Sequence, residues 1–306
     1  MESAKTQKPL ALKPGDAIAV VAPASAPVTG PLKEGLGLLE SWGYEVCPVG
    51  LEDAGDEYLS GEDSVRTARY LAALGDQRFK AVWFARGGYG SVRVLAHLRA
   101  HGLGDYPQRV PPLVVGFSDV SLLLASLSQR AGWACLHGPN VTTLARMSEK
   151  WQTELRRQLG GGYVPGVSGL EEVVGGTGEG PLLVMNLCIL CSVIGTPLAP
   201  DLRGRLLVLE DVSESPYRLD RLFMQLSLSR DFGRLAGLIL GDLDGGWRSS
   251  RLRKTVTELC QGAGISCAFG APLGHGVQQR TLPLGLRARL DVAAGTLDIL
   301  EPLFGP

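Results

Sequence analysis

Short apolar runs alternate with segments of helical spacing through the first half of the chain. The segments between the runs repeat apolar residues every three or four positions, which is typical of amphipathic helices. The apolar runs lie at 16–22, 44–49, 81–85 and 113–115, and the helical segments at 32–42, 64–74 and 91–99. This alternation predicts a parallel sheet covered by helices on both faces. Because ligands bind at the carboxyl ends of the strands in such sheets, we expect function there.

Length and glycine distribution predict two domains. The chain has 306 residues, of which 45% are apolar and 20% charged, so it can bury a core in each of two domains. Nine glycines fall within 160–180, where the apolar pattern loosens. We therefore predict an N-terminal α/β domain over 1–155, a glycine-rich linker over 156–180 and a smaller, strand-rich α/β domain over 181–306. We expect a helix over 151–159 and irregular loops over 160–180. The second domain is expected to contain an apolar helix at 186–194.

Charge and cysteine content exclude several classes of function. A net charge of −1 gives no basic surface for nucleic acid or an anionic membrane, and no apolar run approaches the length of a membrane span. The six cysteines show no disulfide-like pattern, which fits a reducing compartment. Cys188 and Cys191 have C-x-x-C spacing but lie in an apolar segment without a second pair, which favours buried thiols over zinc or redox chemistry. We predict a cytoplasmic protein with no metal and no cofactor.

The apolar run at 113–115 leads into a sharp turn at Ser118. Gly116 lies two residues before this serine and an apolar helical segment follows, which predicts strand, turn and helix. A serine at such a turn is placed as an acyl-transfer nucleophile is. However, Val120 stands where the G-x-S-x-G elbow has its second glycine. Taken alone, the stretch favours a structural serine at a helix N-terminus.

Three further segments carry residues suited to chemistry. Gly88, in a glycine-rich turn after the strand at 81–85, has three interpretations: a phosphate cradle, a tight turn, or an oxyanion hole shared with the residue after Ser118. The spacing differs from G-x-G-x-x-G, which disfavours a dinucleotide site. Glu210 ends an apolar strand, and His275 lies between two glycines, so the glutamate could orient the histidine if the fold brings them together. His137 is a candidate supporting residue.

Taken together, the motifs resemble the LD-carboxypeptidases, serine peptidases that include muramoyltetrapeptide carboxypeptidases and microcin-immunity peptidases. The resemblance covers nearly the whole chain and is carried by Arg86-Gly87-Gly88-Tyr89-Gly90, Gly116-Phe117-Ser118-Asp119, His137-Gly138-Pro139, Leu209-Glu210-Asp211-Val212, Pro216-Tyr217-Arg218-Leu219-Asp220-Arg221, Gly274-His275-Gly276 and Leu282-Pro283-Leu284-Gly285. Two positions depart from the family pattern: Val184-Met185-Asn186 replaces a frequent Gly-Gly-Asn, and Gln279 stands where asparagine is common.

The resemblance implies a fold and roles for particular residues. The fold is a flavodoxin-like or Rossmann-like N-terminal half followed by a strand-rich C-terminal half, usually in a homodimer. Ser118 is the nucleophile, His275 the general base and acid, and Glu210 the orienting acid. The backbone N–H groups of Gly88 and Asp119 form the oxyanion hole.

The implied reaction is removal of the terminal D-alanine from murein tetrapeptides in cell-wall recycling. A carboxypeptidase must bind a free carboxylate, for which Arg86 is the candidate, although a salt bridge at the strand end explains this arginine equally well. One alternative is a microcin-immunity-type peptidase acting on peptide-nucleotide or other acyl-amides. Aromatic residues around 160–185 would favour it by binding a nucleobase, and Tyr163 alone is present. A second alternative is a non-catalytic protein that binds a small anion.

Overall fold

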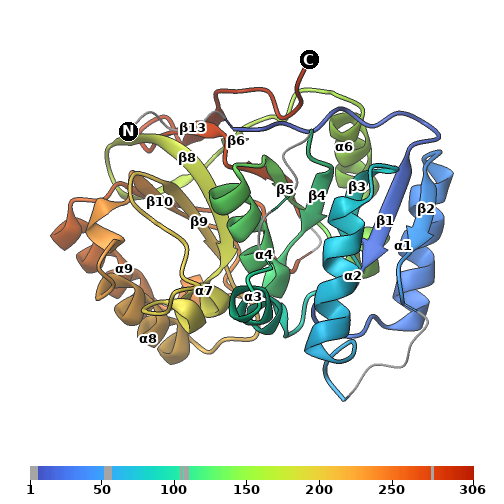
Figure 1. The fold of residues 1–306 in the computed structure, drawn as a ribbon. Helices are drawn as coiled ribbons and strands as arrows, with labels where there is room; N and C mark the ends of the chain where they lie inside the picture. Colours follow the sequence, from blue (N-terminus) through green and yellow to red (C-terminus); the bar gives the residue numbers. More distant parts are fainter. Residues whose placement is uncertain (1–5, 52–56, 104–105, 107–109, 277–278) are drawn as a thin grey trace.

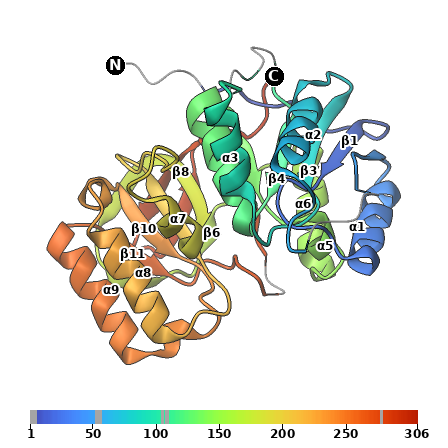
Figure 2. The ribbon, with the colours of Figure 1, turned by 60° about the horizontal axis from the view of Figure 1, so that its bottom comes forward.

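The computed structural model describes residues 6–51, 57–103, 106, 110–276 and 279–306. It consists of two lobes, each built around one sheet, with the N-terminal half of the chain in one lobe and most of the C-terminal half in the other (Figures 1 and 2). Among the described residues, no helix is long and apolar enough to cross a membrane.

The first lobe contains a six-stranded sheet in the order β12-β5-β4-β3-β1-β2. Its first five strands in sequence are parallel, and their order is that of flavodoxin-like folds. The strands are β1 Ala17–Val21, β2 Glu45–Pro48, β3 Phe79–Phe84, β4 Leu113–Gly116, β5 Cys135–His137 and the antiparallel β12 Leu282–Leu284. The predicted parallel sheet is therefore confirmed, with one edge strand supplied by the C-terminal half.

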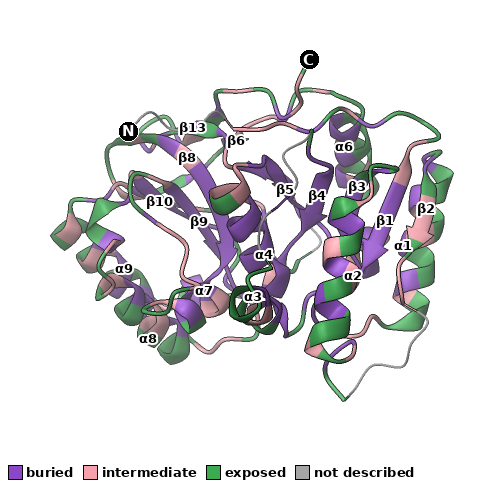
Figure 3. Ribbon diagram, in the orientation of Figure 1, coloured by how far each residue is buried: buried purple, intermediate pink, exposed green. Residues whose placement is uncertain are grey.

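Helices cover both faces of this sheet, as Figure 2 shows. They are α1 Thr29–Ser41, α2 Asp63–Gly75, α3 Ser91–Ala100, α4 Ser121–Ser126, α5 Val141–Leu144 and α6 Glu149–Leu159. Because both faces are covered, the central strands are apolar throughout: β4 is buried along its whole length and β1 along all but its first residue (Figure 3). Helix α4 packs against β4 and also against β8 of the second lobe, so it lies between the two sheets.

The second lobe contains an eight-stranded mixed sheet in the order β6-β14-β13-β8-β9-β10-β11-β7. Strands β8 to β11 are parallel and the outer ones antiparallel. The elements are β6 Val167–Ser168, β7 Glu171–Val174, β8 Thr177–Asn186, α7 Leu187–Val193, β9 Leu206–Glu210, α8 Pro216–Ser227, β10 Gly237–Leu240, α9 Ser250–Ala263, β11 Cys267–Phe269, β13 Arg287–Asp291 and β14 Thr296–Ile299.

The prediction of irregular loops across the glycine-rich segment is wrong in part. Strands β6 and β7 and the start of β8 lie within 160–180. The glycines of β8 serve close packing: a Cβ on Gly178 would lie 2.0 Å from the Ala236 carbonyl oxygen, and one on Gly180 would lie 2.1 Å from that of Gly204. Glycine therefore marks crowded strands here. The exact domain boundaries stay a prediction.

The apolar segment with the C-x-x-C spacing is part strand and part helix. Strand β8 runs to Asn186 and the shorter helix α7 follows. All six cysteines are free thiols. Cys191 is buried, which raises the pKa of its thiol to about 12, and it donates a hydrogen bond to the Leu222 carbonyl oxygen at 3.3 Å. Cys188 is half-buried, so the prediction of two buried thiols holds for only one of them.

Two glycines of α1 make a matched test of helix packing. A Cβ on Gly35 would lie 2.0 Å from the Val141 carbonyl oxygen at the start of α5, whereas a Cβ on Gly37 would meet nothing within 4 Å. We expect Gly35→Ala to lower the free energy of unfolding by about 1–3 kcal/mol through overpacking, and Gly37→Ala to raise it by about 0.5–1 kcal/mol. Urea denaturation of both variants measures the difference. Equal effects would contradict this account of the α1–α5 contact.

Candidate active site

Ser118 lies at a strained turn directly after β4. Its φ angle is +67°, in the left-handed region that non-glycine residues rarely adopt, and the 3₁₀ turn Ser118–Val120 leads into α4. The preceding residue is clamped on both sides, because the Phe117 N–H donates to the Asn140 side-chain oxygen at 3.3 Å and the Asn140 amide donates to the Phe117 carbonyl at 3.2 Å. The sharp turn predicted at Ser118 is therefore present. Asn140 is a supporting residue that sequence analysis missed.

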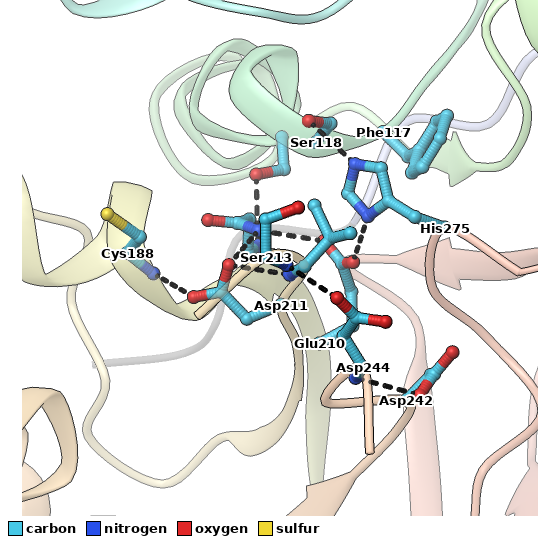
Figure 4. A network of polar contacts seen from close by, with 12 residues as sticks. Phe117, Ser118, Cys188, Glu210, Asp211, Ser213, Asp242, Asp244 and His275 are labelled. Atoms are coloured by element: carbon cyan, nitrogen blue, oxygen red, sulfur yellow. Dashed lines mark hydrogen bonds and ion pairs between the residues drawn. The ribbon is translucent and has the colours of Figure 1, made fainter. Parts of the chain in front are cut away.

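Ser118, His275 and Glu210 form a continuous hydrogen-bonded chain across the two lobes (Figure 4). The Ser118 Oγ lies 3.1 Å from the His275 Nε2, and the His275 Nδ1 lies 2.8 Å from the Glu210 Oε2. Glu210 ends β9 and is 0% exposed, whereas the imidazole of His275 is 24% exposed and faces the serine. The structure thus brings together the three residues that the sequence places more than 60 positions apart.

Tight turns fix the position of His275 after β11. Gly274 has a φ of +144°, and a Cβ there would lie 2.8 Å from the Asp242 Cβ, so only glycine fits without a shift. Two opposing effects act on the pKa of His275. Burial acts to lower this pKa, but the hydrogen bond to Glu210 and the charges of Glu210, Asp211 and Asp242 raise it by more. The pKa therefore lies above its ordinary value of 6.5.

The glycine-rich turn after β3 contacts the serine turn. A Cβ on Gly87 would lie 2.9 Å from the Ser118 Cβ and 3.4 Å from the Asp119 backbone nitrogen. The Asp119 carboxylate accepts a hydrogen bond from the Ser91 N–H at 2.8 Å, and the Ser91 hydroxyl donates to the Asp119 carbonyl at 2.8 Å. Burial raises the pKa of Asp119 to about 6. These bonds hold the start of α3, and with it the turn containing Gly88, against the serine.

Arg66 of α2 is a second supporting residue that sequence analysis missed. Its buried guanidinium donates to the carbonyl oxygens of Gly61 at 2.9 Å and Gly90 at 3.2 Å, and also to that of Pro23. It therefore joins the loop after β1 to the glycine-rich turn. No motif marks this arginine, because its partners come from three separate loops.

A cavity of about 410 Å³ opens beside Ser118 and His275. Arg86 and Arg146 both line it, and the Arg86 Nη1 donates to the Ala26 carbonyl at 2.9 Å. Arg86, the candidate from sequence for carboxylate binding, therefore lines the cavity, and its role stays a prediction. Arg146 follows α5 in a segment that carried no sequence signal. The other lining residues are Val28, Pro31, Gly87, Gly88, Phe117, Asn140, Thr142, Thr143 and Val212.

His137 lies behind the serine turn. It is 0% exposed, its ring packs edge-on against Phe117 with centroids 6.0 Å apart, and burial lowers its pKa to about 4. Neither ring nitrogen has a hydrogen-bond partner among the described residues. Within the same part of the chain, no group of three His, Cys, Asp or Glu residues is placed to hold a metal ion.

A strained serine hydrogen-bonded to a histidine, which is itself hydrogen-bonded to a buried carboxylate, is the arrangement of serine hydrolases. Comparison with known proteins narrows this class. Residues 18–138 match the LD-carboxypeptidase N-terminal domain, and residues 179–290 match the LD-carboxypeptidase C-terminal domain. The chain belongs to the LD-carboxypeptidase family.

Some proteins similar to this chain are named murein peptide carboxypeptidases, and others are named microcin self-immunity proteins. A murein tetrapeptide carboxypeptidase of Pseudomonas aeruginosa is 32% identical over 90% of this chain and 92% of its own length, and a probable murein peptide carboxypeptidase of Bacillus subtilis is 31% identical over 94% and 93%. Among solved structures, the muramoyltetrapeptide carboxypeptidase of Oxalobacter formigenes has a TM-score of 0.77 at 27% identity, covering 94% of this chain and 99% of that one. The microcin C7 self-immunity protein MccF, in complex with glutamyl sulfamoyl guanosine, has a TM-score of 0.84 at 20% identity, covering 98% and 100%.

The raised pKa of His275 leads to a prediction about its titration. We expect the imidazole to titrate above pH 6.5 in the wild-type protein, and Glu210→Gln to lower that pKa because it removes the adjacent negative charge. By linkage, the His275–Glu210 pair stabilises the fold most below the unfolded-state pKa of histidine, and this contribution is lost as the pH rises through the folded pKa. NMR titration of the imidazole measures both variants. A higher pKa in Glu210→Gln would contradict the assigned electrostatics.

Proposed function

We propose that this protein is a serine LD-carboxypeptidase that removes the terminal D-alanine from murein tetrapeptides. The observation that supports it most is the hydrogen-bonded chain from Ser118 through His275 to the buried Glu210, at the edge of a cavity that also contains arginine side chains. Each member comes from a strand end or adjoining loop of a rigid sheet, so the reacting groups are held in place before substrate binds.

In the first step, the Ser118 Oγ attacks the carbonyl carbon of the L-configured centre and its proton passes to the His275 Nε2. Glu210 stabilises the imidazolium through Nδ1. The histidine then gives the proton to the leaving amine, the C–N bond breaks, and D-alanine departs from an acyl-enzyme. A water molecule repeats the path: His275 takes its proton, the acyl ester is hydrolysed, and the serine is restored.

The developing oxyanion needs two hydrogen-bond donors near Ser118. We propose the backbone N–H groups of Gly88 and Asp119 for this role. The close approach of Gly87 to the serine turn supports the proposal, since a Cβ added at Gly87 would lie 2.9 Å from the Ser118 Cβ and 3.4 Å from the Asp119 nitrogen. The bonds between Asp119 and Ser91 keep those segments from moving apart.

Recognition of the substrate's free carboxylate is proposed for the two arginines of the cavity. Arg86 is anchored through one guanidinium nitrogen, which leaves other donors for a ligand, and Arg146 lies in the same cavity. The arginines bring positive charge to the cavity, and Glu210 brings negative charge to the Nδ1 side of the His275 imidazole, away from the Nε2 that faces Ser118. This polarity suits a peptide whose leaving residue is an anion.

A microcin-immunity-type reaction is the second candidate, supported by the structural likeness to MccF. In the described part of the chain, Phe117 is the aromatic residue lining the cavity, and Tyr163 is not among the lining residues. A nucleobase would therefore find little stacking surface there, which favours the murein peptide. We also propose a cytoplasmic location, consistent with six free thiols, and a homodimer, which the resemblance to the family implies.

The test of this function is release of D-alanine from free or UDP-linked L-Ala-D-Glu-meso-diaminopimelate-D-Ala. We expect the wild type to release D-alanine and Ser118→Ala to lose about a million-fold in kcat, as removal of a triad nucleophile does. A fluorophosphonate should label the wild type at Ser118.

The other outcomes separate the alternatives. Labelling of Ser118 without release of D-alanine would point to peptide-nucleotide amides as substrates. A wild type with neither turnover nor labelling, which binds a small anion equally well with or without Ser118, would replace the enzyme by a binding protein.

Carboxylate recognition is tested by comparing the tetrapeptide with its C-terminal amide. We expect Arg146→Ala and Arg86→Ala each to raise the KM for the acid about 10- to 100-fold, because a hydrogen bond between charged groups is lost. The KM for the amide should change far less. Arg203→Ala, at an exposed arginine paired with Asp201 outside the cavity, is the control and should leave both constants unchanged. Equal losses for acid and amide would show that the arginines do not read the carboxylate.

A further inference from the structure

Asn186 occupies the junction between the two halves of the active site. It ends β8 and caps α7, where its side-chain oxygen accepts a hydrogen bond from the Ile189 N–H at 3.1 Å. Its backbone N–H donates to the Ser121 hydroxyl at 3.3 Å, on the helix that follows the nucleophile. Asn186 is only 5% exposed, so these contacts are shielded from solvent. One residue therefore touches both the nucleophile's helix and the second lobe.

The cap determines which way the Asn186 amide points. Because the oxygen is bound by Ile189, the nitrogen faces the end of β9. There it lies 3.3 Å from the Glu210 Oε1 and 3.1 Å from the Asp211 Oδ1, so its two hydrogens serve two different carboxylates. The other Glu210 oxygen accepts from His275 at 2.8 Å. Glu210 thus has a donor on each oxygen and is held with Oε2 toward the histidine.

We propose that Asn186 is a positioning residue of the triad, whose amide holds Glu210 in place for His275 and separates it from the neighbouring carboxylate of Asp211. This inference depends on the proposed function in one respect: the proposed function assigns the triad its catalytic role. Asn186 acts through Glu210 and does not itself touch the substrate cavity.

The chemistry of the site explains why asparagine stands there. Two adjacent carboxylates repel each other when both are buried, and burial together with Glu210 raises the pKa of Asp211 to about 6. Asp211 is further held by the N–H groups of Cys188 at 2.9 Å and Val212 at 2.8 Å. An aspartate at 186 would cap α7 equally well but would bring a third carboxylate and no amide donor, whereas serine would cap it without reaching either acid.

The competing explanation is that Asn186 only caps α7. Asn186→Asp and Asn186→Ser separate the two roles, since both replacements are good N-cap residues. If Asn186 positions Glu210, we expect each variant to lower kcat about 10- to 100-fold with KM within about twofold of wild type, as loss of a hydrogen bond to a charged group implies. Ser249→Ala removes the cap of α9 and is the matched control: it should lower the melting temperature and leave kcat unchanged.

A titration readout keeps this test independent of turnover. The charged and titratable groups acting on His275 are Glu210, Asp211, Asp242 and the buried His137. Asn186→Asp adds a carboxylate beside Glu210, so we expect the imidazole of His275 to titrate at higher pH in this variant than in wild type.

The outcomes distinguish the two proposals. If the wild type is active and both Asn186→Asp and Asn186→Ser keep its kcat, the positioning role is overturned. Asn186 would then serve only as the N-cap of α7. If the wild type neither hydrolyses the tetrapeptide nor reacts with fluorophosphonate, the proposed function fails, and the titration then decides the inference. In that case an unchanged His275 pKa in Asn186→Asp overturns it, and a raised one supports the contact.

Discussion

The fully buried carboxylate of Glu210 is the constraint on which the active-site architecture depends. A negative charge with no solvent contact requires partners on its oxygen atoms, because an unpaired buried charge is strongly destabilising. Two separate segments of the second lobe supply them: His275 comes from a loop after β11, and Asn186 comes from the end of β8. The turn at Gly274 and the cap of α7 hold those partners in place. The same contacts that satisfy the charge also aim the histidine at Ser118.

The two lobes divide the machinery between them. The flavodoxin-like sheet carries the serine and its glycine-rich turn, and the second sheet carries the acid and the histidine. Several ties hold this division together: β12 from the C-terminal half completes the first sheet, α4 packs on both sheets, and Ser121 accepts a hydrogen bond from Asn186. In the catalytic role that we propose, an arrangement split in this way tolerates little relative movement, because a shift of about 1 Å in a positioned group is costly for catalysis.

The acids that act on His275 and the arginines that line the cavity come from different lobes. Negative charge gathers behind His275 on the second lobe, while the arginines face the cavity from the first lobe. The acids raise the pKa of the His275 imidazole above its ordinary value, and the arginines are the residues that we propose for the substrate carboxylate. The chain is similar in sequence to a murein tetrapeptide carboxypeptidase and in fold to MccF.

The sequence by itself determined the parallel sheet, the turn at Ser118 and, through its motifs, the triad candidates, because strand and helix periodicity and glycine placement are local properties. The loops predicted from the glycines of β8 were wrong, because these glycines lie in a strand and pack against the backbone of Ala236 and Gly204. Only the tertiary structure decided the rest. Arg66 and Arg146 carry no local signal, since their surroundings come from distant loops, and the bridging role of Asn186 depends on three elements meeting at one amide. Contacts between distant segments depend on how the sheets pack, and no short stretch of residues encodes that.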